Sequence, residues 1–180
     1  MIAPPVVPDA VRVEWPAVLA LGSNLGDRET TLREAVRDIG ELDGVTVLRA
    51  SGIVETPALK PEGVDEDAPA YLNAVVAVRS ALAPHALLAA LNGIEQAHGR
   101  VRNVRWGDRT LDIDIVTFGG RELATDELTL PHPRAKDRAF VLAPWLDVEP
   151  AAVLPGAGRV DELLKATGET VARYPAEALA

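Results

Sequence analysis

The stretch RWGDRTLDIDIV, residues 105–116, sets both the expected fold and the expected chemistry. Within it, aliphatic residues alternate with Asp112 and Asp114, and such alternation is typical of a β-strand with one buried face. Because side chains two residues apart on a strand point the same way, both aspartates are expected on one face and the aliphatic residues on the other. The stretch therefore predicts a strand with paired carboxylates on its open face.

The segments around this strand alternate between strand and helix patterns. Apolar, β-branched runs predict strands, and apolar residues at helical spacing predict helices. In chain order we expect a strand at 17–23, a helix at 28–42, a bent strand at 45–56, a strand at 71–79, a helix from Pro84 that stops at Gly99, and a strand at 110–118. This is the βαββαβ order of the ferredoxin-like fold, an α+β class in which an antiparallel sheet carries helices on one face.

The remaining segments carry weaker patterns. Residues 1–16 are rich in proline and predict an extended tail, which leaves residues 17–180 as a single domain. The Pro- and acid-rich segment 57–69 predicts a loop. Beyond Gly120, a stretch rich in proline and glycine leads to a short amphipathic helix expected near 160–166.

Composition narrows the possible classes of protein. Hydrophobic residues make up 48% and charged residues 25% of the chain, as in soluble globular proteins. We find no apolar run of roughly 18 residues and no basic N-terminal region of a signal peptide, so we expect a cytoplasmic protein without a membrane partner. The net charge of -9 argues against nucleic acid as a partner. Cysteine is absent, so a bound metal would need oxygen or histidine nitrogen ligands, and with only three histidines we do not expect zinc.

The segment RVRNVRWGDR, residues 100–109, reverses the acidic charge of the chain locally. A cluster of arginines in an acidic protein favours a site for a small anion. The alternative is an exposed loop whose arginines pair with neighbouring acids, and the segment alone leaves both interpretations open.

The aspartate pair also has two interpretations. Two neighbouring carboxylates repel each other unless a cation lies between them, and Mg²⁺ prefers such oxygen ligands. A solvated sheet face is the alternative for an isolated pair. Next to the arginine cluster, however, the pair matches the requirements of phosphoryl transfer, where positioning and charge neutralisation dominate catalysis. Two further alternatives are a Mg²⁺-dependent phosphohydrolase or nuclease on the same sheet, and a non-catalytic ferredoxin-like binding module.

Several motifs in order along the chain carry a resemblance to a known family. They are ALGSNLGDR, ETPAL, YLNAVVAV, IEQAHGRVR, RWGDRTLDIDIV and LPHPRAKDRAFVLAP. From about residue 18 to residue 150 the chain resembles 6-hydroxymethyl-7,8-dihydropterin pyrophosphokinase, or HPPK, and residues 109–116 are the most specific part. The resemblance implies transfer of a pyrophosphoryl group from ATP to the pterin hydroxymethyl group, which gives the pterin diphosphate and AMP in folate biosynthesis.

The resemblance also implies which residues form the site. Asp112 and Asp114 would hold two Mg²⁺ ions, and with Arg100 and Arg109 they are the expected catalytic residues. The expected ATP-binding residues are Glu95, Arg100, Arg102, Arg109, Ile115, Thr129, His132 and Arg138. The expected pterin-binding residues are Thr56, Pro57, Leu59, Tyr71, Asn73, Trp106 and Phe140. ATP and the pterin are the expected partners of a monomeric enzyme.

Overall fold

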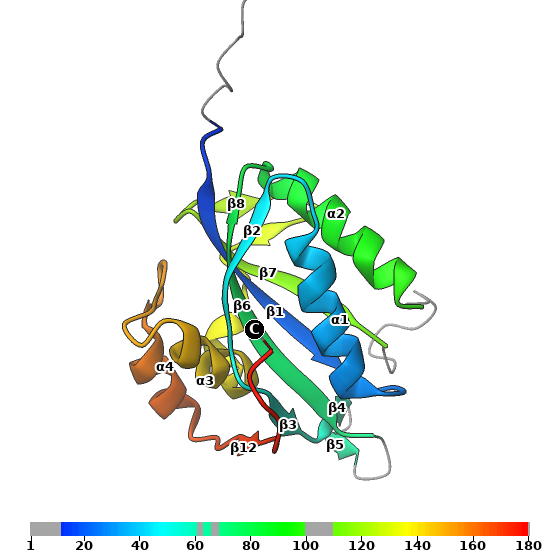
Figure 1. The fold of residues 1–180 in the computed structure, drawn as a ribbon. Coiled ribbons are helices and arrows are strands. Elements are labelled where there is room, and N and C mark those ends of the chain that lie inside the picture. Colours follow the sequence, from blue (N-terminus) through cyan, green and yellow to red (C-terminus); the bar gives the residue numbers. More distant parts are fainter. Residues whose placement is uncertain (1–11, 61–62, 66–68, 100–109, 180) are drawn as a thin grey trace, which may run out of the picture.

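A central antiparallel sheet with helices on both sides organises the computed structural model, which describes residues 12–60, 63–65, 69–99 and 110–179 (Figure 1). For 58–60 and 63–65 the description covers the backbone only. The sheet contains β1 (Trp15–Ser23), β2 (Val45–Ala50), β3 (Val54–Thr56), β6 (Tyr71–Ser80), β7 (Asp112–Phe118) and β12 (Ala172–Arg173). The strand order is β12-β3-β6-β1-β7, with β2 also paired to β6.

Four α-helices and three small hairpins complete these parts of the chain. The helices are α1 (Arg28–Gly40), α2 (Pro84–Ala97), α3 (Ala139–Val148) and α4 (Val160–Thr167), with a 3-10 turn at Ala135–Asp137. The hairpins pair β4 (Ala58–Lys60) with β5 (Gly63–Asp65), β8 (Leu123–Ala124) with β9 (Thr129–Leu130), and β10 (Val153–Leu154) with β11 (Gly158–Arg159). The order of β1, α1, β2/β3, β6, α2 and β7 confirms the predicted ferredoxin-like α+β fold.

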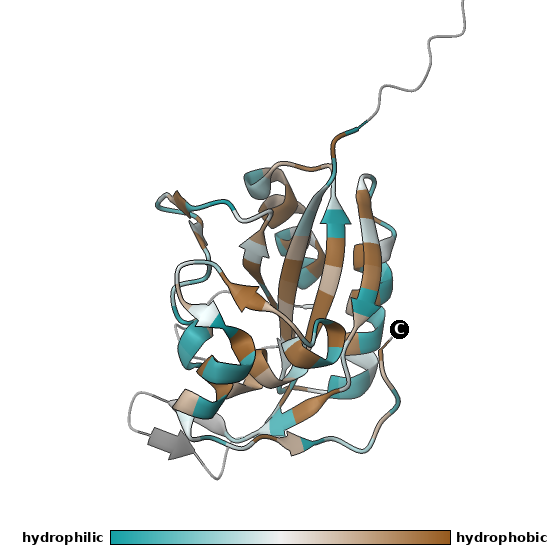
Figure 2. Cartoon of the chain, turned by 90° about the vertical axis from the view of Figure 1, so that its left-hand side faces the viewer, coloured by the Kyte–Doolittle hydropathy of each residue, from teal (hydrophilic) through white to brown (hydrophobic). Residues whose placement is uncertain are grey.

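The sheet separates two hydrophobic cores. Leu19 and Leu21 of β1 point into a core shared with α1 and α2, whereas Val18 points into a second core with α3 and α4. Figure 1 shows the two helix pairs on opposite sides of the sheet. In Figure 2 the central strands are largely hydrophobic and the helices carry hydrophilic outer turns. A strand whose alternate residues enter two cores reads as a continuous apolar run, as residues 17–21 do.

The predicted starts of α1 and α2 are confirmed. Asp27 caps α1, since its Oδ1 accepts a hydrogen bond from the Thr30 backbone N–H at 3.1 Å. Pro84 occupies the first turn of α2, where its missing N–H costs nothing. Helix α1 ends at Gly40, two residues before the predicted end at Leu42.

The bend predicted in residues 45–56 is also confirmed. Strands β2 and β3 both pair with β6, and the break between them contains Ser51 and Gly52. The Ser51 hydroxyl accepts a hydrogen bond from the Val75 backbone N–H at 2.9 Å, which holds the break against β6.

Several elements differ from the predictions. Strand β1 begins at Trp15, inside the predicted tail of residues 1–16, of which residues 1–11 lie outside the described residues. The predicted loop 57–69 contains the β4–β5 hairpin. Helix α4 is confirmed near its predicted position, but α3 and β12 were not predicted. No helix within the described ranges is long and apolar enough to cross a bilayer.

Helix α3 covers part of the sheet face that carries Asp112 and Asp114. It packs against β6 through the second core, which includes Val75, Val141 and Trp145. Helix α3 therefore covers part of the sheet face that was predicted to be open to solvent. Asp112 and Asp114 lie beyond the covered part.

Candidate active site

Strand β7 places the two aspartates on one face. Asp112 and Asp114 are both half-buried, whereas Ile113 and Ile115 are buried at 3% and 2% exposure. This alternation is the one predicted from the sequence. The pairing of β1 with β7 shifts register at Val116, which forms a β-bulge. Val116 lies in the second core, on the side of the aspartates, whereas Phe118 lies in the first core.

A glycine separates the aspartates from the polar residues of β6. Gly22 of β1 is the register partner of Asp112 on one side and of Asn73 on the other. Register partners in antiparallel strands carry their side chains on the same face, and two strand spacings amount to about 10 Å. Asn73 and Asp112 therefore line one surface, and β1 places no side chain of its own between them.

Asn73 is held in place by a hydrogen bond from β6 to β3. Its Nδ2 donates a hydrogen bond to Thr56 Oγ1 at 2.9 Å. A Cβ atom at Gly22 would come within 3.2 Å of Asn73 Oδ1 and within 3.9 Å of a Tyr71 ring carbon. The structure thus brings together Thr56, Tyr71 and Asn73, three of the predicted pterin-binding residues.

Two basic residues flank Asp114. His132 Nε2 and Arg138 Nη1 each lie 3.6 Å from Asp114 Oδ2. His132 Nδ1 accepts a hydrogen bond from the Arg134 backbone N–H at 3.2 Å, so the proton of a neutral ring lies on Nε2 and faces the site. Burial lowers the pKa of His132, while the charge of Asp114 acts in the opposite direction. The neutral imidazole and the guanidinium are thus both donors beside Asp114.

Contacts with β7 and α3 hold His132 and Arg138 in place. The His132 backbone N–H donates to the Val116 carbonyl at 2.8 Å, which ties the segment after β9 to the bulge. Arg138 immediately precedes α3, and its guanidinium carbon lies 5.5 Å from the centroid of the Phe140 ring. Phe140 is half-buried and packs against the second core. Helix α3 therefore positions both Arg138 and Phe140, two of the predicted site residues.

Glu95 has a contact that the sequence did not indicate. Its side chain is 1% exposed, and Oε1 accepts a hydrogen bond from the Ile113 backbone N–H at 2.7 Å. Because Ile113 lies between the two aspartates, this bond from α2 fixes the backbone that carries them. The sequence predicted Glu95 only as a nucleotide-binding residue.

The other predicted residues are placed as follows. The Ile115 side chain enters the first core, away from the aspartate face, so the structure does not bring it to the site. Thr129 is exposed on β9, and Pro57 is exposed directly after β3. Outside the described residues lie Arg100, Arg102, Trp106, Arg109 and the Leu59 side chain.

The donor set suits a hard cation. Within the described ranges no group of three or more His, Cys, Asp or Glu residues could enclose a metal ion. A same-face carboxylate pair supplies part of a Mg²⁺ shell, and Mg²⁺ commonly completes that shell with water and substrate phosphates. His132 presents Nε2–H to the site and so acts as a donor rather than a ligand. The residues present therefore fit Mg²⁺ shared with a polyphosphate.

Comparison with known proteins identifies the family. The model of the family described as 7,8-dihydro-6-hydroxymethylpterin-pyrophosphokinase (HPPK) matches residues 18–150, from β1 to just beyond α3. This chain belongs to the HPPK family. It is 46% identical over 132 residues to the 2-amino-4-hydroxy-6-hydroxymethyldihydropteridine pyrophosphokinase of Bacillus subtilis, an overlap of 73% of this chain and 77% of the relative. The HPPK relative of the same name from Pseudomonas aeruginosa is 39% identical, over 87% of this chain and 95% of its own.

Solved structures share the fold of this HPPK family member at low sequence identity. The Plasmodium falciparum HPPK-DHPS structure with pterin and p-hydroxybenzoate superimposes with a TM-score of 0.65 at 16% identity. The match covers 86% of this chain and 43% of that longer chain. The HPPK fold is thus shared, and more than half of the longer chain has no counterpart in the match.

Gly22 and Arg134 are site residues that sequence reasoning missed. A glycine inside an apolar strand pattern is a signal of close approach by another group, so Gly22 could have been found. The backbone donation from Arg134 that sets the His132 tautomer leaves no signal in the sequence.

Proposed function

We propose that this chain transfers the terminal pyrophosphoryl group of ATP to 6-hydroxymethyl-7,8-dihydropterin, giving the pterin diphosphate and AMP in folate biosynthesis. One observation carries the proposal: Asp112 and Asp114 share a surface with Asn73 across Gly22 in a chain of the HPPK family. Relatives named 2-amino-4-hydroxy-6-hydroxymethyldihydropteridine pyrophosphokinase support the same acceptor.

The pterin hydroxyl oxygen attacks the β-phosphorus and a new P–O bond forms, while the hydroxyl proton passes to water. The bond from the β-phosphorus to the bridging oxygen breaks, and that oxygen leaves with AMP. Asp112 and Asp114 would hold two Mg²⁺ ions, which would supply positive charge to neutralise the triphosphate. His132 and Arg138 donate hydrogen bonds to phosphate oxygens from their positions beside Asp114. Arg100, Arg102 and Arg109 complete the ATP side, with Thr129 and the backbone of Ile115. The buried Glu95 supports this side through the backbone of Ile113.

The acceptor side combines edge recognition with stacking. Asn73 and Thr56 bind the polar edge of the pterin, and their mutual hydrogen bond at 2.9 Å orients both side chains before the ligand arrives. Tyr71, Trp106 and Phe140 supply aromatic surface for a flat heterocycle, and Pro57 and Leu59 supply apolar contacts.

The domain organisation, oligomeric state, location and partners are part of the same proposal. The predicted domain of residues 17–180, extended at its start to Trp15 of β1, forms one catalytic domain, and the enzyme works as a cytoplasmic monomer without nucleic acid or membrane partners. A two-metal hydrolase or nuclease would need further carboxylate ligands, and the described part of the chain offers no group of three. We therefore prefer pyrophosphoryl transfer.

The test is incubation with Mg²⁺, ATP and the dihydropterin, with the nucleotide products resolved. AMP formation that depends on the pterin supports the proposal. ADP would indicate an ordinary kinase, pterin-independent hydrolysis would indicate a phosphohydrolase, and no consumption of ATP would favour a binding module. Asp112→Asn and Asp114→Asn should each lower turnover by on the order of a hundredfold or more. Asp126→Asn, in the exposed turn between β8 and β9, is the matched control.

A further inference from the structure

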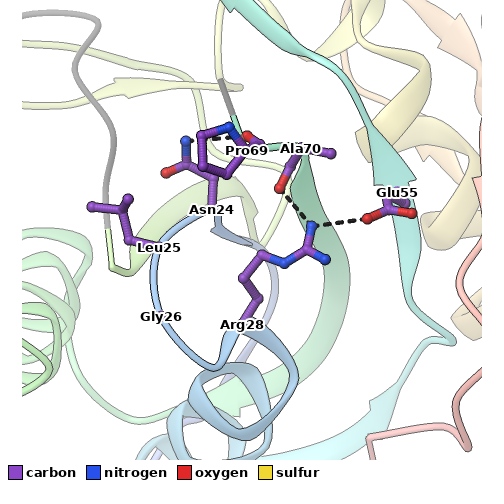
Figure 3. Close-up of a pocket in the computed structure, with 7 residues that line it drawn as sticks. All are labelled: Asn24, Leu25, Gly26, Arg28, Glu55, Pro69 and Ala70. Atoms are coloured by element: carbon purple, nitrogen blue, oxygen red, sulfur yellow. Dashed lines mark hydrogen bonds and ion pairs between the residues drawn. The ribbon is translucent and has the colours of Figure 1, made fainter. Parts of the chain in front are cut away.

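An arginine at the start of α1 links three separate parts of the chain. Arg28 Nη1 donates to Glu55 Oε1 of β3 at 2.8 Å and to the Ala70 carbonyl, just before β6, at 2.6 Å. Figure 3 shows the guanidinium pointing between these two acceptors. A pocket of about 440 Å³ surrounds them, lined by Asn24, Leu25, Gly26, Arg28, Glu55, Pro69 and Ala70.

Both acceptors are immediate neighbours of predicted pterin-binding residues. Glu55 directly precedes Thr56, and Ala70 directly precedes Tyr71. Thr56 and Tyr71 are themselves register partners at the end of the β3–β6 ladder. Arg28 therefore contacts both strands one residue away from the pair that closes this ladder.

Arg28 makes these contacts from the side of the sheet opposite to the pterin residues. The register partner of Glu55 is Leu72, whose side chain lies in the first core with α1. Thr56 alternates with Glu55 and bonds Asn73 on the other face. Arg28 thus lies behind the acceptor surface, where it can act only through the strands.

The contacts of β3 explain why the link between Arg28 and Glu55 affects the position of this strand. Strand β3 has only three residues, Val54–Thr56, and its far edge pairs with the two-residue β12. A second hydrogen bond couples the same turn to the segment before β6, since Asn24 Nδ2 donates to the Pro69 carbonyl at 3.4 Å. The Arg28 side chain is 25% exposed and that of Glu55 is 36% exposed, so the pair is partly shielded from water.

We propose that Arg28 is a positioning residue for the acceptor: by tying Glu55 and Ala70 to the start of α1, it sets the spacing of Thr56 and Tyr71 and hence the affinity for the pterin. The inference rests on the proposed function. ATP binds by the β7 aspartates and the basic residues around His132, so loss of the link changes the pterin affinity selectively.

Steady-state kinetics of Arg28→Met, Arg28→Lys and Glu55→Gln test this role. Arg28→Met keeps the length of the side chain but removes every donor, so we expect a roughly three- to tenfold rise in KM for the pterin. KM for ATP and kcat should stay within about twofold. Arg28→Lys keeps a charged donor and should restore part of the loss, and Glu55→Gln keeps an acceptor and should have a smaller effect.

Arg33→Met is the matched control. Arg33 lies on the same helix, pairs with Glu29 at 2.9 Å and donates to the backbone carbonyls of Glu177 and Ala178, all away from the acceptor residues. It should leave both KM values unchanged. If circular dichroism shows that Arg28→Met does not fold, the KM values of Arg28→Lys are compared with those of wild type instead.

Two results would overturn the role of Arg28. One is a KM for the pterin equal to that of wild type, and the other is an equal rise in both KM values. Failure of the proposed function would look different, because the wild-type protein itself would then form no AMP from ATP and the pterin.

Discussion

Asn73 of β6 and Asp112 of β7 face each other across a single residue, Gly22 of β1, which is the register partner of both. The proposed acceptor-binding residue and the proposed cation-binding residue therefore share one face of the sheet, with about 10 Å between their strands. A side chain at position 22 would stand between them. The proposed sites for the acceptor and the polyphosphate are therefore not separated by a side chain of β1.

We expect Gly22→Ala to impair acceptor binding more than stability. The new Cβ would lie 3.2 Å from Asn73 Oδ1, so the amide must shift and its hydrogen bond with Thr56 is disturbed. Steady-state kinetics should show KM for the pterin raised by roughly tenfold, because a small displacement of a binding group weakens oriented contacts. An unchanged KM for the pterin would contradict the proposed place of Asn73 in the site.

Gly93→Ala serves as the matched glycine control and is a prediction in its own right. Gly93 lies inside α2, and a Cβ there would meet no atom within 4 Å. Alanine reduces the conformational freedom of the unfolded chain and should raise the free energy of unfolding by about 0.5–1 kcal/mol. Urea denaturation measures this change, and the kinetic constants should match those of wild type.

The hydrogen bond between Asp38 of α1 and His98 at the end of α2 predicts a pH effect on stability. Asp38 Oδ2 lies 2.8 Å from His98 Nε2, and this hydrogen bond lowers the pKa of Asp38 below its ordinary value of 3.8. A carboxyl with a lowered folded-state pKa stabilises the fold fully above its unfolded pKa, and this contribution is lost as the pH falls through the folded-state pKa.

Asp38→Asn should therefore be less stable than wild type at pH 6 and should approach wild type as the pH falls to about 3. Urea denaturation at several pH values measures the difference between the two proteins. A difference that stays constant from pH 6 to pH 3 would show that the carboxylate charge of Asp38 contributes nothing.

Helix α3 should unfold together with the sheet. Leu142 is fully buried in the second core, with Val75 of β6 and Val116 of β7 among its members. Leu142→Ala should lower the free energy of unfolding by about 2–5 kcal/mol, because it leaves a cavity between α3 and the sheet. Circular dichroism and tryptophan fluorescence should report one coincident transition. Two separate transitions would argue against a single domain that includes α3.

Local patterns predicted the elements whose periodicity is regular. Helices α1 and α2 have an apolar stripe and a recognisable start, and the alternation of residues along β7 correctly predicts the aspartate face. Helix α3 was missed because it is apolar on nearly every side and contains Pro144, so it lacks helical periodicity. Strand β12 has two residues, and only its pairing with β3 makes it a strand.

The site could be predicted where its residues belong to a single strand or helix. Asp112 and Asp114 lie on one strand, so their shared face follows from their spacing. The relation of Asn73 to Asp112 depends on strand register across β1, and the contact of Arg28 with Glu55 joins two different elements. Such relations arise from tertiary packing, and a single sequence carries no direct signal of them.

The central claim is that Asp112 and Asp114 together hold a divalent cation against a polyphosphate. Titration of Mn²⁺ in the presence of a non-hydrolysable ATP analogue, followed by electron paramagnetic resonance, measures this directly. We expect wild type to bind Mn²⁺ at least about tenfold more tightly than either Asp112→Asn or Asp114→Asn, since each variant loses one charged oxygen ligand. Mn²⁺ affinities in both variants equal to that of wild type would contradict the claim.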